Sequence, residues 1–309
     1  MRHRPLLSLR LRALRLAFQA LRALAPDLAH RGAERLFCTP HRHRAPEAEQ
    51  AAIRESHTFH FMANGLRLRA HVWGEGPAVL GLHGWEGRGS QFHAFIRPMI
   101  QAGFSLITFD QPGHGGSQGS HGGPLDWAQA IHALVRVTGP IHGVVTHSLG
   151  AVGAAIAMDQ GLTVPRAVFL APPSEPDPYY SGLLSMLGFP EADHPAAFKA
   201  YAERLGLPWD RIRLRSLARH LSSPLLVIHD QGDREVPWSN GAAVASAWPS
   251  ASLLTTTGLG HRRIVQDAGV IREAVAFLRQ VPASPSLPIQ GDGLRSLEWH
   301  LFHRDLRTA

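Results

Sequence analysis

The chain has 309 residues, of which 44% are hydrophobic and 18% charged, a length and composition that fit one large domain with a substantial core. Its formal net charge is +7, but residues 1–60 hold eleven arginines against five acidic residues, or +6, which leaves +1 for the rest. A basic arm on a nearly neutral body lacks the phosphate-binding footprint of a nucleic-acid-binding protein. We therefore expect no nucleic-acid partner.

The single cysteine, Cys38, excludes an intramolecular disulfide and leaves pairing only between two copies of the chain. A reducing compartment is the simplest interpretation, so we expect a cytoplasmic protein. The first residues do not form a signal peptide, because arginines interrupt the apolar run where an uncharged core is required. The run is also too short and too charged to span a bilayer.

Residues 5–25 are predicted to form a basic amphipathic helix, because apolar residues recur at helical spacing while arginines keep to another face. Two interpretations follow. The apolar stripe packs on the domain or on the partner subunit of a homodimer, or it lies on an anionic membrane surface as a peripheral contact at the inner face. Residues 38–52 are polar and contain proline, and are predicted to be a linker, so residues 1–56 form a helix and a linker ahead of the main domain. The stripe is Leu7, Leu11, Leu14, Phe18 and Leu21, with Arg12, Arg15 and Arg22 beside it.

Residues 57–73 alternate in polarity about Asn64-Gly65, which predicts a β-hairpin. After the hairpin, short apolar strands alternate with amphipathic helices, a pattern typical of a mostly parallel sheet covered by helices on both faces. The expected strands are 77–84, 104–110, 141–148, 166–173, 224–230 and 251–258, and the expected helices are 89–102, 124–137, 149–160, 239–248 and 262–279.

One interval, residues 174–222, interrupts this alternation with short helices separated by prolines, and we expect it to form a helical lid. The α/β core then comprises residues 57–173 and 223–280. The tail, residues 281–309, is predicted to be a proline-rich linker followed by one short helix.

Polar residues gather at the predicted carboxyl ends of the strands, where open sheets of this kind bind ligands. Ser148 is the most informative of them, because it ends an apolar strand and precedes a helix of small residues. A serine hydroxyl is a poor nucleophile until a base takes its proton, and a tight strand-to-helix turn exposes such a serine above the sheet. The crowded turn needs small residues on both sides. Gly150 meets this need, whereas Thr146 stands where glycine is usual.

The chain resembles the α/β-hydrolase superfamily over roughly residues 57–280, with five matching stretches in the family's order. The resemblance predicts an α/β-hydrolase fold with a small helical lid, and the serine argues against the dehalogenase and epoxide-hydrolase branches, which use aspartate there. The stretches are "LHGWEG" after the third strand, "DQPGHGGS" (110–117), "THSLG" around Ser148, "HDQGDREVP" (229–237) and "GLGHRRIV" (258–265).

The resemblance implies a catalytic triad of Ser148 as nucleophile, His261 as base and Asp233 as the acid that orients it. It also implies an oxyanion hole made by the backbone N–H groups of Trp85 and Leu149. His83 and Gly84 would shape that loop rather than react. The competing acids are Asp230, and Glu175 or Asp177 after the preceding strand.

The function predicted from this resemblance is hydrolysis of carboxylic esters with small to medium acyl chains. We expect Trp85, His147, Leu183 and Met186 to contact the substrate, since the lid is short and apolar. A thioesterase, a lactonase, a C–C hydrolase or an acyltransferase would use the same triad. A ligand-binding protein without turnover is a further alternative, which Thr146 and the atypical N-terminal arm motivate.

The sequence implies no cofactor and no metal. His41 and His43 with Cys38 lack a closed four-ligand spacing. The glycine-rich stretch 113–123 is not followed by Lys-Ser/Thr and does not match a phosphate-binding loop.

Overall fold

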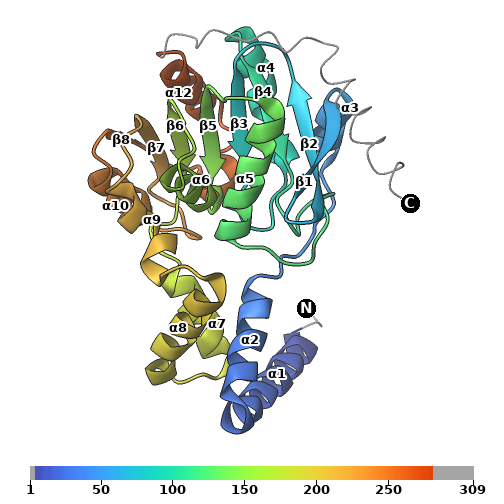
Figure 1. The fold of residues 1–309 in the computed structure, drawn as a ribbon, viewed down its shortest axis with the longest axis vertical. Coiled ribbons are helices and arrows are strands. Elements are labelled where there is room, and N and C mark those ends of the chain that lie inside the picture. Colours follow the sequence, from blue (N-terminus) through green and yellow to red (C-terminus); the bar gives the residue numbers. More distant parts are fainter. Residues whose placement is uncertain (1–3, 281–309) are drawn as a thin grey trace.

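The computed structural model describes residues 4–280 and contains one eight-stranded sheet (Figure 1). The strand order is β1-β2-β4-β3-β5-β6-β7-β8; β2 runs antiparallel to both of its neighbours, and strands β3 to β8 are parallel to one another. This sheet confirms the predicted fold class. The strands are β1 (His57–Ala63), β2 (Leu66–Trp73), β3 (Ala78–Leu82), β4 (Ser105–Phe109), β5 (Gly143–His147), β6 (Ala167–Leu170), β7 (Leu225–Asp230) and β8 (Ala251–Thr256).

Helices cover both faces of the sheet because strands β3 to β7 are apolar on both sides and fully buried. The hairpin turn has positive φ at both Asn64 (50°) and Gly65 (73°), the conformation that joins twisted strands most directly. One face is covered by α5 (Pro124–Thr138), α6 (Gly150–Asp159) and α10 (Trp238–Ala247), and the other by α4 (His93–Gln101) and α12 (Ala268–Leu278).

The segment predicted as a lid folds into short helices, and the N-terminal helices pack against them. We define the cap as α1 (Arg4–Leu24), α2 (Pro26–Phe37), α7 (Asp177–Leu187) and α8 (His194–Leu205), which together project from one end of the α/β core (Figure 1). The remaining short helices of that segment are η2 (Glu191–Asp193), η3 (Trp209–Ile212) and α9 (Leu214–Ala218).

The cap has its own apolar cluster, in which Phe18 of α1 and Ala29 and Ala33 of α2 meet Tyr180 and Leu184 of α7. Ion pairs join the same helices across more than 150 residues of sequence: Arg22 pairs with Asp193 at 2.6 Å, and Arg204 pairs with Glu34. The C-terminal half of the predicted stripe therefore packs on the chain itself.

The N-terminal half of α1 is different, because Leu9, Leu11, Leu14 and Leu16 are all exposed. The prediction that this helix contacts a membrane or a second subunit stays untested. Among residues 4–280, no helix combines the length and the apolar character needed to cross a bilayer.

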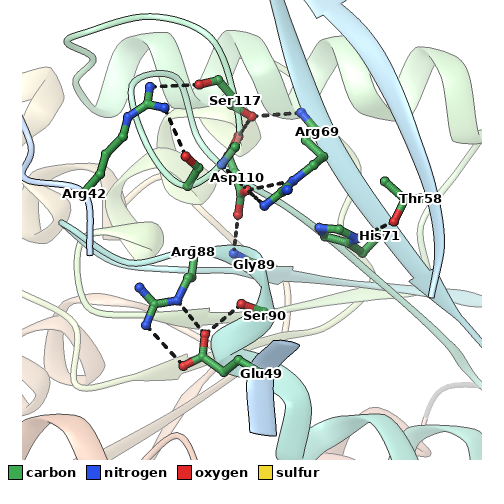
Figure 2. A network of polar contacts seen from close by, with 12 residues as sticks. Arg42, Glu49, Thr58, Arg69, His71, Arg88, Gly89, Ser90, Asp110 and Ser117 are labelled. Atoms are coloured by element: carbon green, nitrogen blue, oxygen red, sulfur yellow. Dashed lines mark hydrogen bonds and ion pairs between the residues drawn. The ribbon is translucent and has the colours of Figure 1, made fainter. Parts of the chain in front are cut away.

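The composition of residues 38–52 predicts a simple linker, but the segment between the cap and the core is more ordered than that. We call residues 38–56 the strap. It contains a third helix, α3 (Glu47–Arg54), and Glu49 on that helix is only 3% exposed. The polar residues that suggested a linker are instead bound to the core. The guanidinium of Arg42 donates to four backbone carbonyls of loop 113–119. The carbonyl of Ser117 is one of them (Figure 2).

Two smaller expectations also differ from the structure. The helix predicted at 262–279 is divided into α11 (Gly260–Arg263) and α12, and the tail prediction for residues 281–309 lies outside the described residues. The remaining 3₁₀ helix, η1 (Gly89–Phe92), leads directly into α4, where one continuous helix was expected.

Candidate active site

Ser148 lies at the turn between β5 and α6 with φ of +52°, a left-handed conformation that non-glycine residues rarely adopt. Its N–H donates to the carbonyl of Leu170 at 2.9 Å, which anchors the turn to the neighbouring strand. A Cβ atom at Gly150 would lie 2.5 Å from the Leu82 oxygen, so only glycine fits there. Backbone strain of this kind, held in place by its surroundings, concentrates at functional sites.

Thr146 does not disturb this turn. It is fully buried in extended conformation inside β5, where it pairs with Leu82 of β3 and Phe169 of β6. β-branched residues are favoured in such positions, so the threonine is accommodated by the strand rather than by the turn.

His261 and Asp233, which the sequence predicts as base and acid, are hydrogen-bonded to each other. The Nδ1–H of His261 donates to Asp233 Oδ2 at 2.7 Å, and the other carboxylate oxygen accepts the N–H groups of Glu235 and Val236, each at 2.9 Å. Burial disfavours the charged carboxylate, but hydrogen bonds from His229, His261 and the Val236 amide outweigh burial and hold the pKa of Asp233 below its usual range. Asp233 is therefore ionised, and because Nδ1 donates to it, the neutral tautomer of His261 carries its lone pair on Nε2.

The competing acids have other partners. Asp230 accepts the N–H groups of Gly232 and Leu259 and the Thr256 hydroxyl, so it fixes the two loops that carry Asp233 and His261. Asp177 pairs with Arg213, and Glu175 lies 3.9 Å from Arg215. Of the candidate acids, Asp233 is the one that pairs with the ring of His261.

The two backbone N–H groups expected to form the oxyanion hole make no hydrogen bond within the described part of the chain. In the part of the chain that the structure describes, neither the Trp85 nor the Leu149 N–H donates to a protein acceptor. Leu149 precedes the first turn of α6, where the helix dipole adds partial positive charge. Trp85 lies in the turn after β3, and a Cβ atom on its neighbour Gly84 would lie 2.8 Å from Ser148 Cβ. The Trp85 turn and Ser148 are therefore in close contact.

His83 shapes this turn, as its position predicts. Its Nε2 accepts the N–H of Gln111 at 3.0 Å, which makes Nδ1 the protonated nitrogen that donates to the Gly84 carbonyl at 2.7 Å. Burial is the main cause that lowers the pKa of His83 to about 3, so the ring is neutral.

His147 supports the base rather than the nucleophile. Its Nε2–H donates to the backbone carbonyl of His261 at 2.8 Å, and the two rings lie 4.8 Å apart. Burial, followed by the proximity of His261, lowers the pKa of His147 to about 4, so this histidine is also neutral near pH 7.

Ser148, His261, Trp85 and Leu149 all line one cavity of about 610 Å³. Its walls come from both the core and the cap. Apolar residues include Val152 of α6, and the cap and strap side contributes Phe37, Cys38, Tyr179, Tyr201, Trp209 and Ile212.

Leu183 and Met186, which we expected to contact the substrate, do not line this cavity. Met186 is 42% exposed, and Leu183 packs against the apolar cluster of the cap. Both lie on α7, whose Tyr179 reaches the cavity instead. Trp85 and His147 do line it, as expected.

Sequence reasoning missed Phe37 and Cys38, which sit at the end of α2 and reach the cavity beside Tyr201. The Cys38 thiol lies 2.9 Å from the Tyr201 hydroxyl, and burial raises the pKa of the thiol to about 11. No local motif marks these positions, since their role depends on α2 packing against α8. Beside these residues, Glu86 binds His41, and Arg88 binds Glu49.

Within residues 4–280, the structure contains no group of three or more His, Cys, Asp or Glu side chains arranged to hold a metal ion.

Comparison with known proteins identifies the family to which this fold belongs. A family model described as the alpha/beta hydrolase family matches residues 79–274. The chain belongs to the α/β-hydrolase family. A pimeloyl-[acyl-carrier protein] methyl ester esterase of Xanthomonas campestris pv. campestris is 30% identical over 258 residues, which cover 70% of this α/β hydrolase and 100% of that relative. A relative from Variovorax paradoxus, named for carbamate hydrolysis, is 26% identical and covers 72% of this chain and 99% of its own.

Several solved structures have the same fold as this chain, although their names describe different activities. A bromoperoxidase from Bacillus anthracis has a TM-score of 0.57 at 18% identity and covers 73% of this chain and 100% of its own. The epoxide hydrolase VrEH1 from Vigna radiata has a TM-score of 0.54 at 16% identity, over 74% and 99%. One fold thus carries several chemistries, and function must be argued from the site.

Proposed function

We propose that this α/β hydrolase is a serine esterase that cleaves carboxylic esters of small to medium acyl chains through an acyl-enzyme. The observation that supports this most is the convergence of three features on one cavity. These are Ser148 in a strained left-handed turn, the His261–Asp233 pair, and the free N–H groups of Trp85 and Leu149.

The proposed reaction follows from this geometry. His261 Nε2 takes the hydroxyl proton as Ser148 attacks the ester carbonyl, and Asp233 stabilises the imidazolium that forms. The Trp85 and Leu149 amides bind the oxyanion of the tetrahedral intermediate. His261 then gives the proton to the departing alcohol, which leaves an acyl-serine. A water molecule, deprotonated by the same histidine, releases the acid and restores Ser148.

The cavity supports the substrate class. Its cap side is apolar and aromatic, which suits an acyl chain, and about 610 Å³ falls in the usual range of small-molecule sites. The names of the two relatives, an ester hydrolase and a carbamate hydrolase, support acyl substrates with a heteroatom leaving group.

The test is hydrolysis of p-nitrophenyl esters from acetate to palmitate, with Ser148→Ala as the inactive variant. Ser120→Ala is the matched control, because Ser120 is exposed and does not itself line the cavity. We expect kcat/KM to peak at short or medium chains and to vanish in Ser148→Ala alone. A peak at long-chain esters would contradict the proposed substrate class.

Thioesters, lactones and alcohol acceptors are included in the same panel, since the triad also suits thioesterase, lactonase and acyltransferase activity. C–C substrates such as β-diketones complete it. A kcat/KM for any of these that exceeds the best ester would replace the proposed activity. Absence of turnover on every substrate would favour a ligand-binding protein.

A further inference from the structure

The turn that carries the Trp85 N–H depends on contacts from outside itself. Gly84 and Gly87 flank it, and glycine permits many backbone conformations. Between them Glu86 has φ of +56°, an unfavourable conformation for a residue with a side chain. The only backbone bond closing the turn runs from the Gly87 N–H to the Gly84 carbonyl, at 3.1 Å. The Nδ1–H of His83 donates to the same Gly84 carbonyl, and Glu86 binds His41. These contacts hold the start and the middle of the turn, and its far end needs a restraint of its own, because an oxyanion donor must be held within a fraction of an ångström.

Glu49 of the strap binds the residues immediately after this turn. Its carboxylate accepts Arg88 Nε at 2.5 Å, Arg88 Nη2 at 3.3 Å and the Ser90 hydroxyl at 2.7 Å (Figure 2). The Arg88 guanidinium also donates to the His43 carbonyl at 3.1 Å. The Glu49 and Arg88 side chains are only 4% and 12% exposed, so these are not loose surface contacts.

A second carboxylate holds the same segment from the core. Asp110, paired with Arg69, accepts the Gly89 N–H at 2.9 Å and the Gly116 N–H at 2.7 Å. In Figure 2, Gly89 points to Asp110 while Arg88 and Ser90 point to Glu49. Residues 88–90 are therefore hydrogen-bonded to two carboxylates on different segments. These bonds restrain the backbone of the turn just before them.

We propose that Glu49 is a positioning residue for the oxyanion hole: through Arg88 and Ser90 it fixes the turn that aims the Trp85 N–H. This inference rests on the proposed function. Glu49 lies in the strap, outside the residues 79–274 that match the family model. The contacts that position the turn are therefore made by the N-terminal arm of this chain. Glu49 and Arg88 also line the cavity, so the KM readout below separates positioning of the turn from direct contact with the substrate.

Glu49→Gln tests the proposal, with kinetic and binding readouts made on the full chain. An intact donor is worth about 10²–10³ in rate, and we expect a misaimed one to lower kcat about 10-fold with KM within about twofold. The affinity of a trifluoromethyl ketone, whose adduct with Ser148 carries an oxyanion, should fall by the same factor as kcat/KM. The affinity of the carboxylic acid product should change little.

Two controls separate positioning from stability. Glu47→Gln changes an exposed carboxylate on the same helix, which pairs only with Arg54. Val270→Ala removes methyl groups from the buried face of α12, and is expected to lower Tm while leaving kcat unchanged. Ser90→Ala removes one donor to Glu49 without leaving a buried charge unpaired, so it provides the test if Glu49→Gln does not fold. We expect Ser90→Ala to lower kcat about threefold, with the same signature.

Three results would overturn the proposal. The first is unchanged kcat and ketone affinity in Glu49→Gln, or in Ser90→Ala where only that variant folds. The second is an equal loss of kcat in Val270→Ala. The third is a raised KM with unchanged kcat, which would make Arg88 a substrate-binding residue instead. Failure of the proposed function looks different, because it would appear in the wild-type protein itself, either as no turnover or as a preference for another substrate class.

Discussion

The two sides of the cavity are built in different ways. On the core side, Ser148, Asp233 and His261 each lie within a few residues of the end of β5, β7 or β8, so the local backbone places them. On the cap side, Phe37 and Tyr201 lie 164 positions apart and meet only because α2 packs against α8. The difference teaches that the chemistry depends on the sheet, whereas the shape of the substrate space depends on contacts between distant helices.

The largest expected effect concerns the choice of acid on the core side. Asp233→Asn should lower kcat by about 10⁴, because the amide favours the wrong tautomer of His261. Asp230→Asn should act mainly on stability, since Asp230 binds only loop amides and a hydroxyl. Steady-state kinetics and thermal unfolding of both variants check this. A folded Asp230→Asn variant that loses more activity than Asp233→Asn would reassign the acid.

Residues on the core side should also account for most of the loss of folding stability at low pH. Burial is the main cause that lowers the pKa of His71, His114 and His147 to about 4, against about 6.5 in an unfolded chain. The unfolded chain therefore binds protons below pH 6.5 that the folded chain does not, and stability falls as the pH drops from about 6.5 toward 4. One such histidine accounts for about 2 kcal/mol at pH 5.

Urea unfolding at pH 7.5 and pH 5 measures this effect. The lowered pKa values of Asp110 and Asp233 act in the same direction at still lower pH, because these carboxylates lose their partners once protonated. Equal or greater stability at pH 5 would mean that the histidines are not buried and neutral as the structure places them.

A smaller effect is expected from the cap side, and it should change selectivity rather than rate. Phe37→Ala widens the apolar end of the cavity beside Tyr201, so kcat/KM for an octanoyl ester should rise about 10-fold relative to a butyryl ester. Met186→Ala is the matched control on the cap, since Met186 is exposed and lies outside the cavity. An unchanged ratio in Phe37→Ala would show that acyl chains do not reach α2.

The smallest expected effect lies on the outer surface of the cap. Leu9, Leu11, Leu14 and Leu16 are exposed beside arginines, so we expect weak binding to vesicles with anionic lipid, reduced in an Arg10→Glu/Arg12→Glu variant. Co-sedimentation with anionic and neutral vesicles measures it. Equal binding to both vesicle types would remove the electrostatic component, and a dimer in sedimentation velocity would indicate that a second chain covers these leucines.

The sequence predicts the core side well because its signals are local. Alternating strands and helices, the small residues around Ser148 and the glycine before His261 each report the backbone at their own position. The cap and the strap could not be predicted in this way. Nothing near Phe37 indicates that it meets Tyr201, and Arg42 and Glu49 read as solvated linker charges until the loop and turn that they bind are placed beside them. The places of Leu183 and Met186 outside the cavity could not be predicted for the same reason, because the rotation of a cap helix decides which of its residues face inward.

The most direct test of the central claim is intact-mass analysis after reaction with a fluorophosphonate, beside Ser148→Ala and Ser120→Ala. The site described above predicts one adduct per chain in the wild-type protein and in Ser120→Ala, and none in Ser148→Ala. Folded wild-type protein that stays unlabelled, or labelling that persists in Ser148→Ala, would contradict the assignment of Ser148 as an activated nucleophile.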